Sequence, residues 1–157
     1  MPSITTIMQM VVATLATSCA ADGINCHGSS ACAAFQKNDG SGATYTNPNV
    51  VVRLVNFIKT VDDNRMYENG QHIACLPGLY NINDGGEVNG AICAFLQSTT
   101  NGMRGNDLKV IAQDLQDHGC RGCGSVPTGY PETNDVNGGM LTFNFVNDNT
   151  GNCDGVC

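Results

Sequence analysis

The chain has 157 residues, the size of one domain, and a formal net charge of −7 from seven basic and 14 acidic residues. The basic residues form no run that could follow a phosphate backbone, so the composition argues against nucleic-acid binding and against adsorption to anionic membranes. With 19 glycines and no tryptophan, we expect many loops around a compact core, which cross-links would help to stabilise.

The first 21 residues match a secretory signal. An apolar run at residues 7–16 is too short to span a membrane, and the small residues at 17–21 suit a cleavage site after Ala20 or Ala21. We therefore expect residues 1–21 to be a signal peptide and residues 22–157 to be the mature domain. Because no Lys or Arg precedes the run, a buried N-terminal helix or strand is the alternative. No later segment resembles a membrane span, and stable membrane insertion is not expected.

The cysteine count agrees with secretion. Nine cysteines are present, and cleavage after Ala20 or Ala21 would remove Cys19 and leave an even set. An even set is compatible with four disulfides in an oxidising, extracellular compartment. The eight remaining residues are Cys26, Cys32, Cys75, Cys93, Cys120, Cys123, Cys153 and Cys157.

The first half of the mature chain predicts a strand, a loop and a helix. Residues 23–32 alternate apolar and polar side chains, which indicates a short strand running into a turn, and residues 37–45 have the composition of a loop. Residues 48–61 are predicted to be helical, with Asn47 as the cap, Pro48 at the first position and apolar residues at helical spacing. The β-branched run at residues 50–52 leaves a strand as the alternative.

The second half predicts three or four strands and one helix. Residues 71–76 and 79–82 flank Pro77-Gly78 as two short strands or one strand interrupted by a turn, residues 83–86 form a turn, and residues 91–98 are a central strand. Asn106 is expected to cap a helix that ends at Gly119. Residues 124–139 are expected to form a loop, and residues 140–146 are expected to form the last strand. The face of that helix consists of Leu108, Ile111, Ala112 and Leu115.

This order is the split β-α-β pattern. It predicts an α+β fold, in the form of an α/β sandwich, with two helices on one face of an antiparallel sheet.

Two pairs of cysteines at close spacing lie near the two ends of the mature chain. Cys26 and Cys32 precede the first helix, and Cys120 and Cys123 follow the second. Bridges between the pairs would tie the first ordered segment to a late one and enclose the chain between them. A zinc site that adds His27 or His118 is an alternative. A redox site is disfavoured, because Cys120-x-x-Cys123 follows a helix instead of opening one.

Catalytic motifs are absent from the sequence. His27, His72 or His118 could pair with an acidic residue such as Glu68, Glu87 or Glu132 for acid–base chemistry. However, the chain contains no Gly-x-Ser-x-Gly elbow, phosphate loop or His-Glu-x-x-His helix. We expect a protein that is not an enzyme and needs no cofactor, with a small secreted hydrolase as the alternative.

Four segments carry a family resemblance. They are residues 23–32 (GINCHGSSAC), 96–99 (LQST), 118–125 (HGCRGCGS) and 134–147 (NDVNGGMLTFNFVN). In this order the chain resembles the killer-toxin family of virus-infected smut fungi and its secreted fungal relatives. The resemblance implies a secreted, disulfide-bonded α/β sandwich that is not an enzyme and that inhibits competitor cells by blocking calcium uptake. It also implies that Cys26 and Cys32 pair with Cys120 and Cys123.

The chain departs from the family pattern in two ways. Gly102 and Lys109 stand where the smut toxin has cysteines, whereas Cys93 and Cys157 are additions. The smut toxin also has a basic loop after the cysteine that matches Cys75, but residues 77–87 here contain no Lys or Arg. A cation-mimicking contact therefore cannot be transferred to that loop.

The remaining candidates for a target contact are Arg104, Lys109 and Arg121, which we expect to lie at or near the cysteine pairs, although all three also fit an ordinary solvated surface. The sequence thus predicts a monomeric, extracellular toxin with a cell-surface target such as a calcium channel. A secreted effector or cell-wall-binding module without channel blockade is the rival interpretation, and the acidic charge favours it.

Overall fold

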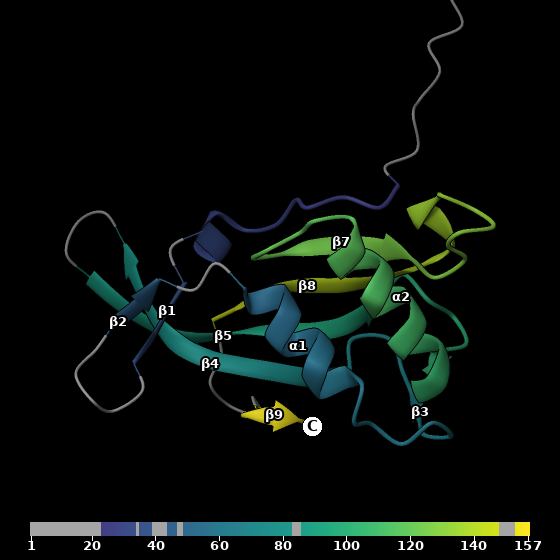
Figure 1. Ribbon diagram of the computed structural model, residues 1–157, viewed down its shortest axis with the longest axis horizontal. Coiled ribbons are helices and arrows are strands. Elements are labelled where there is room, and N and C mark those ends of the chain that lie inside the picture. Colours follow the sequence, from purple (N-terminus) through teal and green to yellow (C-terminus); the bar gives the residue numbers. More distant parts are fainter. Residues whose placement is uncertain (1–22, 34, 39–43, 47–48, 83–85, 148–152) are drawn as a thin grey trace, which may run out of the picture.

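The computed structural model describes residues 23–157 except 34, 39–43, 47–48, 83–85 and 148–152. The described residues form an antiparallel sheet with two helices, α1 (Val50–Ile58) and α2 (Gly105–Asp117), side by side on one face (Figure 1). The predicted α+β architecture is confirmed. The signal-peptide prediction and Cys19 fall outside the described residues.

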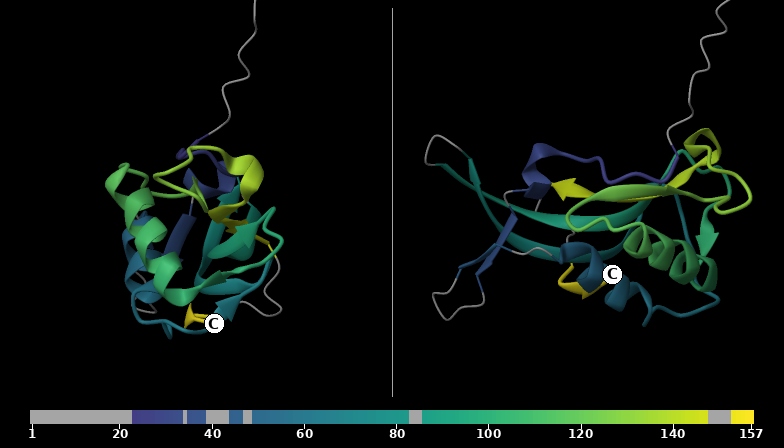
Figure 2. Two further views of the ribbon diagram at one scale, coloured as in Figure 1. Left: turned by 90° about the vertical axis from the view of Figure 1, so that its right-hand side faces the viewer. Right: turned by 45° about the horizontal axis from the view of Figure 1, so that its top comes forward.

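The strands of the main sheet follow the order β2-β1-β4-β5-β8-β7, and β9 pairs with β4 beside this path. Figure 2 shows that the far ends of β4 and β5 extend past the helices, where β1 pairs with β4 and β2 pairs with β1. A separate two-stranded ribbon joins β3 (Met66–Tyr67) to β6 (Met103–Arg104). The strands of the main sheet are β1 (Phe35–Asn38), β2 (Thr44–Thr46), β4 (His72–Ile82), β5 (Gly86–Gln97), β7 (Gly124–Pro127), β8 (Met140–Val146) and β9 (Gly155–Val156).

Helix α1 forms within the predicted range in spite of its β-branched residues. All five of its inward side chains are fully buried against the sheet and α2, and this burial outweighs a weak helix propensity. The alternative strand is wrong, and the helix ends at Ile58, before the expected Val61. The expected cap Asn47 and Pro48 lie outside the described residues. The buried side chains are Val50, Val51, Leu54, Val55 and Ile58.

Helix α2 buries the predicted face but begins earlier than expected. Leu108, Ile111, Ala112 and Leu115 are all buried, and Gly119 follows the helix with a positive φ of 94°. The cap position is Arg104, not Asn106, because the helix starts at Gly105, whose missing side chain lets the backbone pack on the carbonyl of Asp62.

Strand β4 runs without a turn through Pro77 and Gly78, which pair with Ala91 and Gly90 of β5. The prediction of a turn there is wrong. On its other edge, β4 pairs with β9 at residues 74–75 and with β1 at residues 79–80, so Pro77 lies between these two partners. A proline, which has no backbone N–H to donate, is tolerated in a strand where a partner is missing.

Two loop predictions and two strand predictions also need correction. Within the predicted loop 37–45, the described residues belong to β1 and β2, and within the loop 124–139, residues 124–127 form β7. Residues 23–32 make only an isolated bridge between Asn25 and Ser125 and then a short 3-10 helix, η1 (Ser30–Ala33). Strand β8 is not the last, because β9 follows it. The turn at 83–85 is outside the described residues.

Candidate functional site

Two disulfides join the start of the described chain to the segment after α2. Cys26 bonds to Cys120 and Cys32 bonds to Cys123, with sequence separations of 94 and 91 residues. We call residues 23–33 and 119–124, with these two bridges, the clasp. It encloses α1, the β4–β5 hairpin and α2. The pairing that the family resemblance implies is the one observed, and sulfurs held in disulfides do not act as zinc thiolates.

Glycines let the two segments of the clasp approach each other. A Cβ at Gly28 would lie 2.6 Å from the Cβ of Cys123, and a Cβ at Gly124 would lie 2.6 Å from the carbonyl oxygen of Asn25. At this approach, Asn25 and Ser125 exchange two backbone hydrogen bonds of 2.9 and 2.8 Å. Backbone pairing and two covalent bonds thus hold the first segment along the edge strand β7 (Figure 1).

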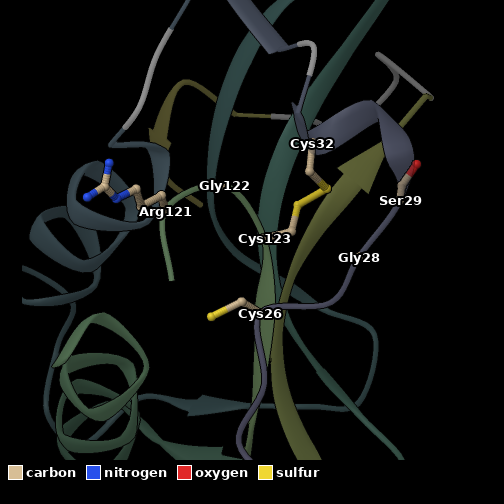
Figure 3. Close-up of a pocket in the computed structure, with 7 residues that line it drawn as sticks. All are labelled: Cys26, Gly28, Ser29, Cys32, Arg121, Gly122 and Cys123. Atoms are coloured by element: carbon tan, nitrogen blue, oxygen red, sulfur yellow. A yellow bond between two sulfur atoms is a disulfide. The ribbon is translucent and has the colours of Figure 1, made fainter. Parts of the chain in front are cut away.

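A hollow of about 240 Å³ lies between the segments of the clasp. Figure 3 shows the Cys32–Cys123 bridge at its centre and the Arg121 side chain extending away from that bridge. The hollow is lined by Cys26, Gly28, Ser29, Cys32, Arg121, Gly122 and Cys123.

Arg121 is held by its backbone and free at its charged end. Its carbonyl oxygen accepts a 2.9 Å hydrogen bond from the N–H of Val51 in the first turn of α1, while the residue itself is exposed. The backbone therefore fixes where the guanidinium emerges, and no ion pair to a described acidic residue neutralises it. An exposed cation without such an ion pair, on a main chain held in place beside a hollow, can contact an acidic group on another molecule.

The structure separates the other two basic candidates from Arg121. Arg104 is exposed at the start of α2, and Lys109 forms an ion pair with Asp63. Arg121 follows the end of the same helix, whose 13 residues span about 20 Å at 1.5 Å each. The expectation that Arg104 lies near the clasp is wrong, because the length of α2 separates it from Arg121, whereas Lys109 lies within the helix between them.

The other two bridges lie on the face of the sheet that the helices leave uncovered. Cys75 bonds to Cys93, its direct partner across β4 and β5, and Cys153 bonds to Cys157 at the end of the chain. Cys75 and Cys93 pack with Ala91 in a small cluster of their own, apart from the main core. Because side chains alternate across a strand, Ala74 and Leu76 point the opposite way, into the helical layer.

The histidines raised as acid–base candidates are scattered. His27 and His118 are exposed, and His72 packs against the ring of Phe95 with centroids 6.0 Å apart. Glu68 and Glu132 are exposed as well, and the side chain of Glu87 lies outside the described part. Within the described residues, no histidine lies within 4 Å of a carboxylate oxygen.

One carboxyl group of α2 is perturbed. Burial, together with the nearby charge of Asp117, raises the pKa of Asp114 above its ordinary value, and the Oδ2 atom of Asp114 has no hydrogen-bond partner among the described residues. Sequence reasoning did not identify this group. The signal that could have found it is its spacing, because Asp114 follows the buried Ile111 by three residues and precedes the buried Leu115 by one.

Comparison with known proteins agrees with this framework. The family model described as Kp4 matches residues 9–147. This chain belongs to the Kp4 killer-toxin family. The chain is also 36% identical over 125 residues to the KP4 killer toxin of Ustilago maydis P4 virus, and the alignment covers 80% of each protein.

Membership of the Kp4 family makes the protein toxin-like. The matched region contains the clasp, both helices and every strand of the main sheet except β9. No helix among the described residues is long and apolar enough to cross a lipid bilayer. The Kp4 match stops before the Cys153–Cys157 bridge, which closes the C-terminal end of this chain.

Proposed function

We propose that the protein is a secreted killer toxin that acts on competitor or host cells by binding, without catalysis, and that its target is a calcium channel at the cell surface. Its likeness to a protein named KP4 killer toxin supports the toxic role. The signal-like pattern of residues 1–21 and the eight cysteines of residues 22–157 support secretion of the mature domain into an oxidising compartment.

The position of Arg121 carries the proposed contact. In an acidic protein, the few local cations must supply any positive charge at the mouth of a cation pathway. Lys109 is already paired with Asp63, and Arg104 lies at the far end of α2. Of these three candidates, Arg121 alone is both exposed and fixed beside a hollow.

A second function is favoured by the charge of the molecule. The net charge is −7, and residues 77–87, which include the paired ends of β4 and β5, contain no Lys or Arg. An effector or cell-wall-binding module that kept the fold and lost channel blockade would have these properties. The two functions differ in what the protein does to calcium entry.

Growth of fungal and plant cells exposed to the purified, oxidised protein tests the proposal. We expect growth inhibition by the parent and a weaker effect of Arg121→Glu. Lys59→Glu is the matched control, because Lys59 is exposed at the far end of α1, and it should inhibit like the parent. Arg104→Glu and Lys109→Glu test the other two candidates. If the folded Arg121→Glu variant inhibits as well as the parent does, the proposed contact is wrong.

A further inference from the structure

A second hollow lies between α2 and the segment that follows β7, and none of the residues of the clasp lines it. Its volume is about 280 Å³. Pockets for drug-sized ligands have roughly 300–1,000 Å³, so this hollow has the size for one long side chain. It is lined by Met103, Asp107, Val110, Ile111, Thr128 and Tyr130.

Four of the six residues that line this hollow have apolar or aromatic side chains, and one of these, Val110, is unusually exposed. Val110 is 59% exposed, more than Met66 or Val156, the other large apolar side chains that are exposed among the described residues. A lone exposed valine needs no explanation. Here, however, Val110 lines the same hollow as Met103, Ile111 and Tyr130, so it is one of several apolar side chains gathered there.

The charge of the hollow is negative. Asp107 is exposed in the first turn of α2, where the helix N-terminus stabilises a carboxylate, and it is the one charged residue of the lining. It forms no ion pair with a described basic residue: Lys109 is paired with Asp63, and the exposed Arg104 lies beyond salt-bridge distance of Asp107. The carboxylate therefore remains available to a cation from another molecule.

We propose that this hollow receives an arginine or lysine side chain of a partner protein. These side chains combine an apolar stem with a cationic head, which matches a group of apolar side chains beside one carboxylate that forms no ion pair with a described residue. The stem lies against Met103, Val110 and Ile111, and the head meets Asp107 next to the aromatic ring of Tyr130, a further favourable neighbour for a cation. A neutral side chain leaves Asp107 unpaired, and an acidic one is repelled by it.

The inference goes beyond the proposed toxin contact, because the hollow lies along the first half of α2, whereas Arg121 follows the end of that helix, and the two carry opposite charge. Two probes separate charge from shape. N-acetyl-arginine methylamide carries the cation, and N-acetyl-citrulline methylamide has nearly the same shape without it. Each is titrated into the oxidised protein, while NMR follows the methyl groups of Val110 and Ile111.

We expect saturable shifts of both methyl groups with the arginine probe and an affinity up to about fivefold lower for the citrulline probe, because an exposed ion pair contributes up to about 1 kcal/mol. Asp107→Asn should lower the affinity for the arginine probe to that for the citrulline probe. Val110→Thr should lower the affinity of the protein for both probes. Glu68→Gln, which removes an exposed carboxylate elsewhere, and Arg121→Glu should leave both affinities unchanged.

The two probes also define how the inference fails. Equal affinities of the parent for both probes would show that charge plays no part, and an absence of saturable shifts would show that the hollow binds no such side chain. Either result overturns the proposal. A loss of binding in Arg121→Glu would also overturn it, because the probe would then occupy the clasp. None of these readouts depends on toxicity, so failure of the toxin proposal leaves the test intact.

Discussion

The two bridges of the clasp close nearly the same long loop, so their contributions to stability should not add. If Cys26 and Cys120 are both replaced by Ala, the Cys32–Cys123 bridge still closes a loop with a separation of 91 residues. The free energy of unfolding then falls only by the contribution of closing a small ring, which consists of residues 26–32 and 120–123. In the chain-entropy relation a ring of roughly this size contributes about 3 kcal/mol.

Removing both bridges also opens the long loop. A loop of about 100 residues contributes about 4.7 kcal/mol in the same relation, so replacing all four cysteines should cost about 8 kcal/mol. This exceeds twice the cost of one bridge, because whichever bridge is lost second costs more than the one lost first. Many domains have a total stability of about 5–15 kcal/mol, and the four-fold variant is expected to be largely unfolded.

Urea unfolding followed by circular dichroism measures these costs for the parent, each single-bridge variant and the variant without either bridge. Each single loss should lower the free energy of unfolding by about 3 kcal/mol. Two results would refute the reasoning. One is a cost of about 4.7 kcal/mol for each single loss with simple additivity, which would mean that the bridges close independent loops. The other is a single-bridge variant as stable as the parent.

Three further predictions concern other parts of the chain. Gly105→Ala should destabilise the protein by about 1–3 kcal/mol in thermal unfolding, because the new Cβ would overlap the carbonyl of Asp62, although alanine favours helices. Gly138→Ala is the control and should have little effect, because the space around Gly138 is open. Equal melting temperatures for the two variants would contradict this packing. Asp114→Asn should raise the melting temperature at neutral pH but not at pH values below the ordinary pKa of 3.8. The pKa of Asp114 is raised in the folded state, so ionisation of this carboxyl group destabilises the folded protein as the pH rises past 3.8. If the two melting temperatures differ by the same amount at every pH, ionisation of Asp114 is not the cause. Intact mass and thiol labelling of the secreted product should show a start near Ala21 or Asp22 and no free thiol, whereas a product that retains Met1 or takes up label without reduction would contradict cleavage before the domain.

Local patterns predicted the helices because each helix needs only one buried face. The spacing of Leu108, Ile111 and Leu115 identified the inner face of α2, and the apolar residues of α1 did so despite their β-branched side chains. The caps were less predictable. Whether α2 begins at Gly105 or at Asn106 depends on the contact between Gly105 and Asp62, which are far apart in the sequence.

Strand pairing and the geometry of the site depend on distant partners and were predicted less well. Pro77 reads as a turn residue, and only the gap between β1 and β9 on the edge of β4 makes it acceptable in a strand. The cysteines at 26, 32, 120 and 123 were recognised as a clasp, but their pairing rested on the family resemblance, because eight cysteines allow 105 connectivities. The predicted helix between Asn106 and Gly119 already separates Arg104 from Arg121 along the chain, but nothing in the sequence shows that Lys109 is paired with Asp63.

The central claim is that this Kp4-family protein uses the face of the clasp to block the entry of calcium into cells. The most direct test is to measure calcium influx into fungal cells. It should be recorded with purified oxidised parent, with Arg121→Glu and with the Lys59→Glu control, after melting curves have shown that all three are folded. We predict that the parent and Lys59→Glu reduce influx and that Arg121→Glu does so less. Growth inhibition by the parent with undiminished calcium influx would contradict the claim and favour the effector or cell-wall-binding function.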